Sequence, residues 1–282
     1  MIARHDQVAA GRPGSARSAD GTPIGYRSLG SGPGLVVVGG ALRSGQDYAE
    51  LGRHLSSHAT VHLMDRRGRG ASGPQGADYS LRTEVEDLLA VQTDTGASWA
   101  FGHSYGGLVV LECARRHPSF ARVALYEPGV SAGPFPTAWM EGYRRRLAAG
   151  DERGAFAEFI RGSGGAPAVL RRMPVWYLRS ILRIGFRGGA WRGIRDLLPA
   201  NLAEHEQVAA RAGHLADYAE VGTPVLLLTG SRTPAPDRTF HELAAVLPDC
   251  AHVILAGLDH FGTEGRSAAR VAEAVRAFLT AP

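Results

Sequence analysis

The sequence predicts an α/β fold with a mostly parallel sheet, and three features indicate it. Short apolar runs alternate along the chain with amphipathic stretches of helical periodicity. The runs are rich in β-branched residues and some are bounded by glycine, which is typical of strands buried on both faces. A glycine-rich turn at residues 102–107 also stands between a strand pattern and a helix pattern, where α/β folds place functional groups.

The expected strands are six apolar runs. They cover residues 34–39, 60–65, 98–102, 121–126, 224–229 and 251–256. Amphipathic stretches between them, such as 80–95 and 107–117, are expected helices. Strands that alternate with helices imply right-handed crossovers between parallel neighbours. Residues 1–20 are polar and lack the apolar core of a signal peptide, so we expect a tail or the lead-in to an edge strand.

The alternation stops between residues 129 and 220. Helical patterns occur there at 139–147, 153–160, 175–184 and 200–218. A helical insertion between two strands is expected to cover the C-terminal edge of the sheet, where open α/β sheets bind ligands. The predicted organisation is a polar tail (1–20), a core (21–128 and 221–282) and a helical cap (129–220).

Composition excludes several classes of protein. With 282 residues and 44% hydrophobic content, the chain can form a large folded core. All 31 basic residues are Arg and they are scattered, so we expect no nucleic-acid partner. No apolar run has the length of a membrane span, so we also expect no membrane partner. Two cysteines are too few for a disulfide framework, which favours the cytoplasm, and a homodimer remains open.

The turn at 102–107 has the pattern Gly-x-Ser-x-Gly, with Ser104 between Gly102 and Gly106. A tight turn from strand to helix leaves no room for a Cβ at the flanking positions, which explains the glycines. The serine then projects above the sheet. The N-terminus of the following helix offers a positive dipole to a developing negative charge. The pattern therefore predicts a nucleophilic serine.

With this turn in place, the chain resembles the α/β-hydrolase superfamily from about residue 21 to residue 279. Four other segments carry the resemblance: Gly30-Ser-Gly-Pro-Gly34, Asp65-Arg-Arg-Gly-Arg-Gly-Ala-Ser72, Tyr126-Glu-Pro128 and Gly257-Leu-Asp-His260. The resemblance implies an α/β-hydrolase fold with a helical cap inserted after the sixth strand. It also implies a serine hydrolase of an esterase- or lactonase-like branch that needs no cofactor.

The resemblance assigns a catalytic triad. Ser104 is the nucleophile, and His260, which follows the last strand, is the base. In most of the family the acid follows the seventh strand, but Thr233 occupies that place here and cannot serve. Glu127, at the end of the sixth strand, is the preferred acid because some branches place it there. Asp237 is the alternative, although Asp is also a common helix N-cap.

The oxyanion hole is expected to use the backbone N–H groups of Tyr105 and Ala41. Relatives usually have His-Gly-X where this chain has Gly39-Gly40-Ala41, so a histidine that steadies the loop is missing. His103 either packs beneath the turn, which is favoured, or borders the substrate. No spacing of His, Cys or carboxylates predicts a metal site. The candidate substrate-binding residues are Gly40, Leu42, His103, Trp139 and Trp176.

We therefore expect a cofactor-independent serine hydrolase that acts through an acyl-enzyme. Its substrate would be a carboxylic ester, lactone or thioester of a fairly hydrophobic small molecule, because the cap is rich in aromatic residues. Two alternatives remain open because the acid is displaced and the oxyanion loop lacks its His. One is a lyase, cyclase or perhydrolase acting on a specialised metabolite. The other is a ligand-binding pseudoenzyme.

Overall fold

The computed structural model describes residues 11–164, 166, 168–233 and 237–281. In this part of the chain, eight strands form one sheet in the order β1-β2-β4-β3-β5-β6-β7-β8. The pairings β1–β2 and β2–β4 are antiparallel, and the other pairings are parallel. The strands are β1 (Arg12–Arg17), β2 (Pro23–Leu29), β3 (Gly34–Val38), β4 (Thr60–Met64), β5 (Trp99–His103), β6 (Arg122–Tyr126), β7 (Val225–Gly230) and β8 (Cys250–Leu255).

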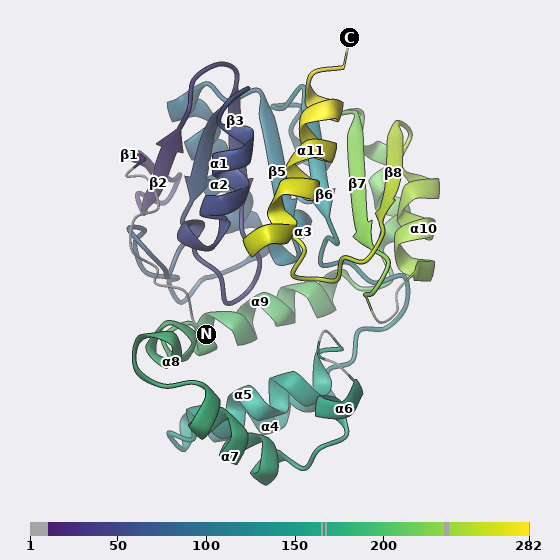
Figure 1. The fold of residues 1–282 in the computed structure, drawn as a ribbon. Helices are drawn as coiled ribbons and strands as arrows, with labels where there is room; N and C mark the ends of the chain where they lie inside the picture. Colours follow the sequence, from purple (N-terminus) through teal and green to yellow (C-terminus); the bar gives the residue numbers. More distant parts are fainter. Residues whose placement is uncertain (1–10, 165, 167, 234–236, 282) are drawn as a thin grey trace.

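Helices cover both faces of the sheet and form a separate lobe below it (Figure 1). The α-helices are α1 (Ala49–Leu55), α2 (Leu81–Thr95), α3 (Tyr105–Arg116), α4 (Ala138–Ala148), α5 (Glu152–Gly162), α6 (Ala168–Arg171), α7 (Val175–Gly185), α8 (Gly188–Arg195), α9 (Leu198–Arg211), α10 (Asp237–Val246) and α11 (Ala268–Leu279). Short 3₁₀ helices are η1 (Gly45–Tyr48), η2 (Leu215–Glu220) and η3 (Gly265–Ser267).

Two apolar cores lie on opposite faces of the sheet because neighbouring residues of a strand point to opposite sides. In β3, Val36 and Val38 join a core with helices α2, α3 and α10. Leu35 and Val37 join a core with α1 and α11, the two helices in front of the sheet in Figure 1. Both faces of the central strands are therefore buried, which explains their continuous apolar sequences.

All six predicted strands are confirmed, each with ends within one residue of the expected ones. The prediction of a tail is wrong for Arg12–Arg17, which forms edge strand β1 and pairs with β2. The expectation of a segment leading into an edge strand is closer to the structure. Both β1, the edge strand, and β2, which lies next to it, were missed because they lack the continuous apolar run of a central strand.

The segment between β6 and β7 (residues 129–220, called the cap below) is helical wherever regular structure occurs in its described residues. Helix α9 lies between the sheet and the rest of the cap, at the end where the parallel strands have their carboxyl termini (Figure 1). The cap has its own apolar core, which includes Trp139, Tyr143 and Leu178. Among the described residues, no helix has the length and apolar character needed to span a bilayer.

Candidate functional site

Ser104 occupies a sharp turn between the end of β5 and the start of α3. Its φ of 53° lies in the left-handed region, which non-glycine residues rarely adopt. The turn also brings backbones together: a Cβ on Gly102 would lie 2.6 Å from the Gly106 oxygen, and one on Gly106 would lie 2.2 Å from the Val38 oxygen. Glycine is therefore required on both sides of Ser104. The serine stands at the N-terminus of α3, whose first N–H groups have no partner within the helix.

Ser104, His260 and Glu127 form a chain of hydrogen-bonding distances. His260 Nε2 lies 3.1 Å from Ser104 Oγ. On the other side of the ring, His260 Nδ1 lies 2.8 Å from Glu127 Oε2. A carboxylate only accepts, so Nδ1 carries the proton, and Nε2 is free to accept from the serine hydroxyl. This is the arrangement that allows a histidine to take the proton of a serine.

Glu127 is buried at the end of β6, with a φ of 44°. Its second carboxylate oxygen, Oε1, accepts hydrogen bonds from the Gly230 N–H at 2.8 Å and from the Thr233 hydroxyl. Thr233, at the position where relatives have the acid, thus holds the carboxylate that comes from β6. The alternative acid, Asp237, is the first residue of α10, and its side chain lies outside the described part of the structure.

A second chain of hydrogen bonds runs beneath the serine. The Gly40 N–H donates to the Tyr48 hydroxyl at 2.8 Å, and that hydroxyl lies 2.7 Å from His103 Nδ1. His103 Nε2 lies 2.9 Å from the carbonyl oxygen of His260 and so donates to it. Burial lowers the pKa of His103 well below its usual range, which keeps the ring neutral. The structure places His103 beneath the turn with both ring nitrogens hydrogen-bonded, which favours the packing role over contact with substrate.

Arg66, which follows β4, holds the loop after β3. Its guanidinium is fully buried. Nε donates to the Gly39 carbonyl at 2.8 Å, and Nη2 donates to the Gly40 carbonyl at 3.1 Å. In a trans peptide the N–H points opposite to the carbonyl of the preceding residue. Arg66 therefore fixes the directions of the Gly40 N–H, which meets Tyr48, and of the Ala41 N–H, which points away from the guanidinium.

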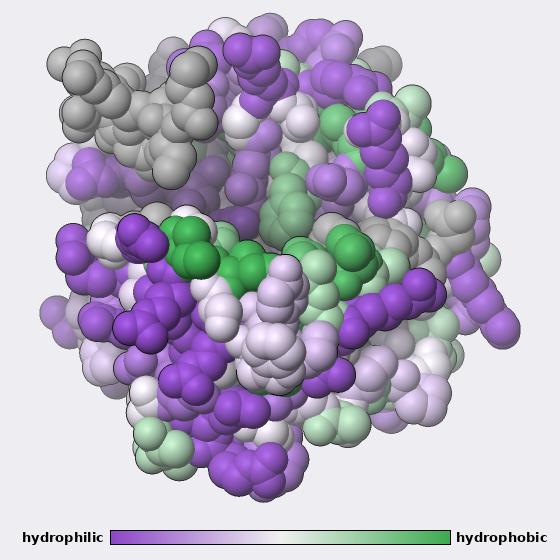
Figure 2. Space-filling view, turned by 60° about the horizontal axis from the view of Figure 1, so that its bottom comes forward, coloured by the Kyte–Doolittle hydropathy of each residue, from purple (hydrophilic) through white to green (hydrophobic). Residues whose placement is uncertain are grey.

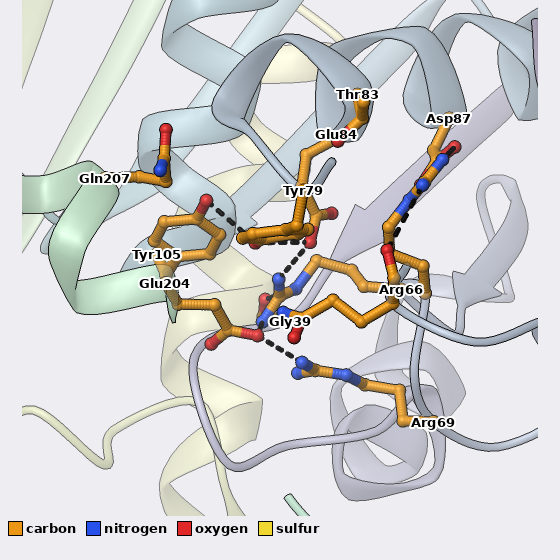
Figure 3. A network of polar contacts seen from close by, with 12 residues as sticks. Gly39, Arg66, Arg69, Tyr79, Thr83, Glu84, Asp87, Tyr105, Glu204 and Gln207 are labelled. Carbon is orange, nitrogen blue, oxygen red and sulfur yellow. Dashed lines mark hydrogen bonds and ion pairs between the residues drawn. The ribbon is translucent and has the colours of Figure 1, made fainter. Parts of the chain in front are cut away.

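Buried carboxylates from two helices balance the charge of Arg66 (Figure 3). Glu84 of α2 accepts from Arg66 at 2.7 Å, and Glu204 of cap helix α9 pairs with it at 2.9 Å. Glu204 also pairs with Arg69, whose guanidinium is likewise buried. Burial raises the pKa of Glu84, and the charge of Arg66 opposes that shift. We call Arg66, Arg69, Glu84 and Glu204 the buried ion network.

Tyrosines connect the buried ion network to the serine turn. The Tyr79 hydroxyl donates to Glu84 at 2.8 Å and lies 2.9 Å from the hydroxyl of Tyr105. The Arg66 guanidinium also lies over the Tyr105 ring, 4.8 Å from its centroid. Sequence reasoning missed this network because its two arginines are among 31 in the chain and nothing in their local pattern marks them as buried.

The structure places the remaining candidate substrate-binding residues in different surroundings. Gly40 lies against the serine, since a Cβ there would be 3.0 Å from Ser104 Cβ. Leu42, with a φ of 56°, packs against the cap core, and buried Trp139 is part of that core. The structure does not bring Trp176 to the other candidate residues: it is 70% exposed on α7. Because α7 buries Leu178 and Leu182, Trp176 two residues earlier lies on the opposite side of the helix.

Aromatic side chains of the cap surround a histidine above the site. The His205 ring on α9 lies 5.5 Å from Trp139 and 5.0 Å from Phe159, between ring centroids. Burial lowers the pKa of His205, and the hydrogen bond to the Asn201 carbonyl and the charge of Glu204 oppose that shift. A groove of about 830 Å³ runs from Leu42 and Arg43, past loop 68–74, to helix α8 and Phe186. The groove therefore connects Phe186 and α8 of the cap with Leu42 and Arg43, which directly follow the loop at residues 39–41.

The chain is similar to known hydrolases along most of its length. The model of the alpha/beta hydrolase family matches residues 35–274. A pimeloyl-[acyl-carrier protein] methyl ester esterase of Xanthomonas oryzae is 26% identical over 275 residues, which cover 89% of this chain and 96% of that protein.

Solved structures agree with these matches. An alpha/beta hydrolase from Sphaerobacter thermophilus superposes with a TM-score of 0.81 at 30% identity, over 95% of this chain and all of that one. The enol-lactonase from Burkholderia xenovorans shares the fold, with a TM-score of 0.71 at 22% identity, over 95% of this chain and all of that one.

Proposed function

Since this chain belongs to the alpha/beta hydrolase family, and is a hydrolase of that family, we propose that it is a serine hydrolase acting on a carboxylic ester, lactone or thioester. The observation that carries the proposal is the contact of His260 with both Ser104 and Glu127, at 3.1 and 2.8 Å. A serine hydroxyl is unreactive at neutral pH unless a base takes its proton, and this geometry provides one.

In the first half of the reaction, Ser104 Oγ attacks the carbonyl carbon of the substrate while its proton moves to His260 Nε2. A new C–O bond forms, and the carbonyl π electrons become a negative charge on oxygen. Glu127 stabilises the imidazolium through Nδ1. The N–H groups of Ala41 and Tyr105 bind the oxyanion, and Arg66 positions the first of them by holding the Gly40 carbonyl.

The tetrahedral intermediate then collapses. The bond to the leaving oxygen or sulfur breaks, and the leaving group takes the proton from His260 Nε2. The acyl group stays on Ser104 as an ester. Water then attacks this ester while His260 again takes a proton, and a second collapse releases the carboxylic acid and returns the proton to Ser104.

The substrate class rests on the pocket and on one relative. Leu42, Phe135 and Phe159 pack against the cap core, so the cap offers apolar groups to a substrate. The Xanthomonas esterase, similar over 89% of the chain, is named for a methyl ester. We therefore place a fairly hydrophobic small ester first, with lactones and thioesters as related carbonyl substrates.

Two features of the sequence leave two alternative functions to consider, a non-hydrolytic enzyme and a pseudoenzyme. These features are the displaced acid and the missing histidine of the oxyanion loop. The distance of 2.8 Å between Glu127 and His260 supports a working acid in the displaced position. The bonds of Arg66 to Gly39 and Gly40 support a loop that is held without the histidine. Both observations favour hydrolysis.

The test is intact-mass spectrometry after exposure to a fluorophosphonate, with hydrolysis of a p-nitrophenyl ester in parallel. We expect one adduct on the wild type and none on Ser104→Ala. Glu127→Gln should slow labelling and hydrolysis by about 10²–10⁴-fold, because it removes the charge that stabilises the imidazolium. Asp237→Asn is the matched control and should behave like the wild type. An adduct or full turnover in Ser104→Ala would overturn the proposal.

A further inference from the structure

The outer part of the cap has a charge unlike that of the rest of the chain. Residues 159–195 contain eight Arg and no Asp or Glu. The rest of the chain contains 23 Arg and 27 acidic residues, a net charge of −4 against a total of +4. We call residues 159–195 the outer cap segment. Asp151 and Asp196, just outside the segment, pair with Arg179 and Arg195, and the remaining positive charge favours anionic partners at this end of the molecule.

The same segment exposes an apolar helix face. On α7, Trp176 is 70% exposed and Ile184 is 69% exposed, and Tyr177 and Ile181 are exposed between them. Leu178 and Leu182 of the same helix are buried against the cap core. Figure 2 shows hydrophobic side chains gathered at the end of the molecule that faces the viewer, with hydrophilic residues beside them. The helix thus has an apolar inner side and a second apolar side facing solvent.

Arginines lie on α7 and at both of its ends. Arg179 and Arg183 are within the helix, Arg171 and Arg172 precede it, and Arg187 follows it; all five are exposed. Arg179 pairs with Asp151 at 3.1 Å, so part of its charge is neutralised. The combination of Trp, Tyr and Ile with flanking arginines is typical of helices that lie in a lipid interface. Arginine stems can lie along the apolar region while their guanidinium groups bind phosphate.

The expectation of no membrane partner rests only on the lack of a spanning segment, and it does not bear on binding at a membrane surface. We propose that α7 and the arginines around it bind the surface of an anionic lipid bilayer. Trp176, Ile181 and Ile184 enter the interface between headgroups and acyl chains, and the arginines bind lipid phosphates. The helix lies at the end of the cap farthest from the sheet (Figure 1), so it can reach a flat surface without obstruction by the core. Residues of the catalytic site take no part in this contact.

The positive charge of the outer cap segment disfavours a second copy of this chain as the partner that binds α7. A symmetric dimer through α7 would bring two outer cap segments together, each with eight Arg and no acidic residue. An acidic protein would satisfy the arginines, but exposed aliphatic side chains on a protruding helix fit a deformable lipid interface better than a rigid partner. A lipid surface satisfies both the charges and the apolar groups.

The groove beside the outer cap gives this contact a consequence for the proposed hydrolase. Phe186, directly after α7, lines the groove that also reaches Leu42, the neighbour of Ala41. A lipophilic ester dissolved in the bilayer would be able to enter this groove at Phe186 and move along it toward Leu42, next to the loop that carries Ala41. This last step rests on the proposed function, whereas binding to the bilayer does not.

The test uses the Ser104→Ala protein, so that binding is measured without turnover. It is sedimented with vesicles of phosphatidylglycerol and phosphatidylcholine in equal parts, and with vesicles of phosphatidylcholine alone. We expect the anionic vesicles to bind at least about tenfold more tightly. Trp176→Ser with Ile184→Ser, and separately Arg183→Gln with Arg187→Gln, should each weaken binding by about fivefold or more.

The matched control is Val253→Ser with Ile254→Ser, which removes exposed apolar groups from β8 at the far edge of the sheet. It should bind like the parent, and all variants should melt at the same temperature. Equal binding to both kinds of vesicle, no binding, or parental binding by the α7 variants would overturn the proposal. So would a dimer that dissociates in Trp176→Ser, or binding to soluble polyglutamate without binding to vesicles. Hydrolysis of a soluble ester by the α7 variants, in the wild-type background, tests the proposed function separately.

Discussion

Two regions of the cap differ in the arginines that they meet. One contacts buried arginines of the core, and the other carries exposed arginines of its own. Helix α9, next to the sheet, sends Glu204 into the interior, where it pairs with the buried Arg66 and Arg69. The outer cap segment carries eight Arg with no acidic residue of its own, and two of them, Arg179 and Arg183, lie on α7 together with exposed apolar side chains. The first region is joined to the oxyanion loop and the second faces solvent.

The difference follows from the cost of removing charges from water. A buried guanidinium must be paired and hydrogen-bonded, so Arg66 and its partners can adopt few arrangements and hold the loop in one of them. Exposed arginines remain hydrated and are free to bind an external anion. Composition alone does not separate the two roles, because the residue type is the same and only burial differs.

The largest expected effect comes from replacing Arg66, the buried core residue that pairs with Glu204 of α9. Arg66→Met should lower kcat by about 10²–10³-fold with little change in KM, because the Ala41 N–H loses its fixed direction. Kinetics on a soluble ester measure both constants, and Arg183→Met is the control in the outer region.

Arg66→Lys separates an effect on catalysis from a loss of folding. The lysine keeps the buried positive charge, but it cannot bind the carbonyls of both Gly39 and Gly40. We expect it to fold and still to lose kcat. Wild-type kcat in both variants of Arg66 would contradict its role in positioning the loop.

A second comparison can be made within α9 itself. Glu204 is buried in the network, whereas Glu206 forms an exposed pair with Arg144 at 2.6 Å. Glu204→Gln should lower the free energy of unfolding by about 3 kcal/mol, because it leaves two buried guanidinium groups short of a partner. Glu206→Gln should change it by less than about 0.5 kcal/mol. Urea unfolding measures both, and equal losses would show that burial does not distinguish these carboxylates.

The smallest expected effect concerns pH. Burial lowers the pKa of His205 below its usual 6.5, so the folded protein keeps this ring neutral while the unfolded chain takes up a proton. Stability from His205 is present above pH 6.5 and is lost as pH falls from there toward the folded pKa. The slope is at most about 1.4 kcal/mol per pH unit.

His205→Leu should therefore make the free energy of unfolding depend less on pH between about pH 7 and about pH 5. Urea unfolding across that range measures the slope, with His58→Leu at an exposed position as the control. A steeper dependence of the free energy of unfolding on pH in His205→Leu would contradict the lowered pKa of His205 in the folded protein.

Much of the site could be predicted because its signals are local. Gly102, Ser104 and Gly106 form a turn whose glycines are required by backbone contacts within a few residues. His260 follows the last strand in a short, recognisable segment, and Glu127 directly follows β6. The structure brings these three side chains together as the sequence order predicts, although their catalytic roles stay a proposal.

Other residues lie elsewhere than expected or were missed because their roles depend on which side of an element is buried. Trp176 lies on an amphipathic helix with apolar residues on two sides, and the sequence does not say which side meets the cap core. Tyr48 and Thr233 carry hydroxyl groups that meet partners 55 and 106 residues away in the chain. No local pattern records such contacts.

The sequence by itself determined the six strands from β3 to β8, the serine turn and the helical character of residues 129–220, because each depends on periodicity or on backbone space within a short segment. Only the tertiary structure decided which arginines are buried, which carboxylates neutralise them and what holds the oxyanion loop. These contacts join the loops after β3 and β4 to α2 and α9, which are distant in sequence. Their energies depend on exclusion of water, and water is excluded only when the whole fold has formed.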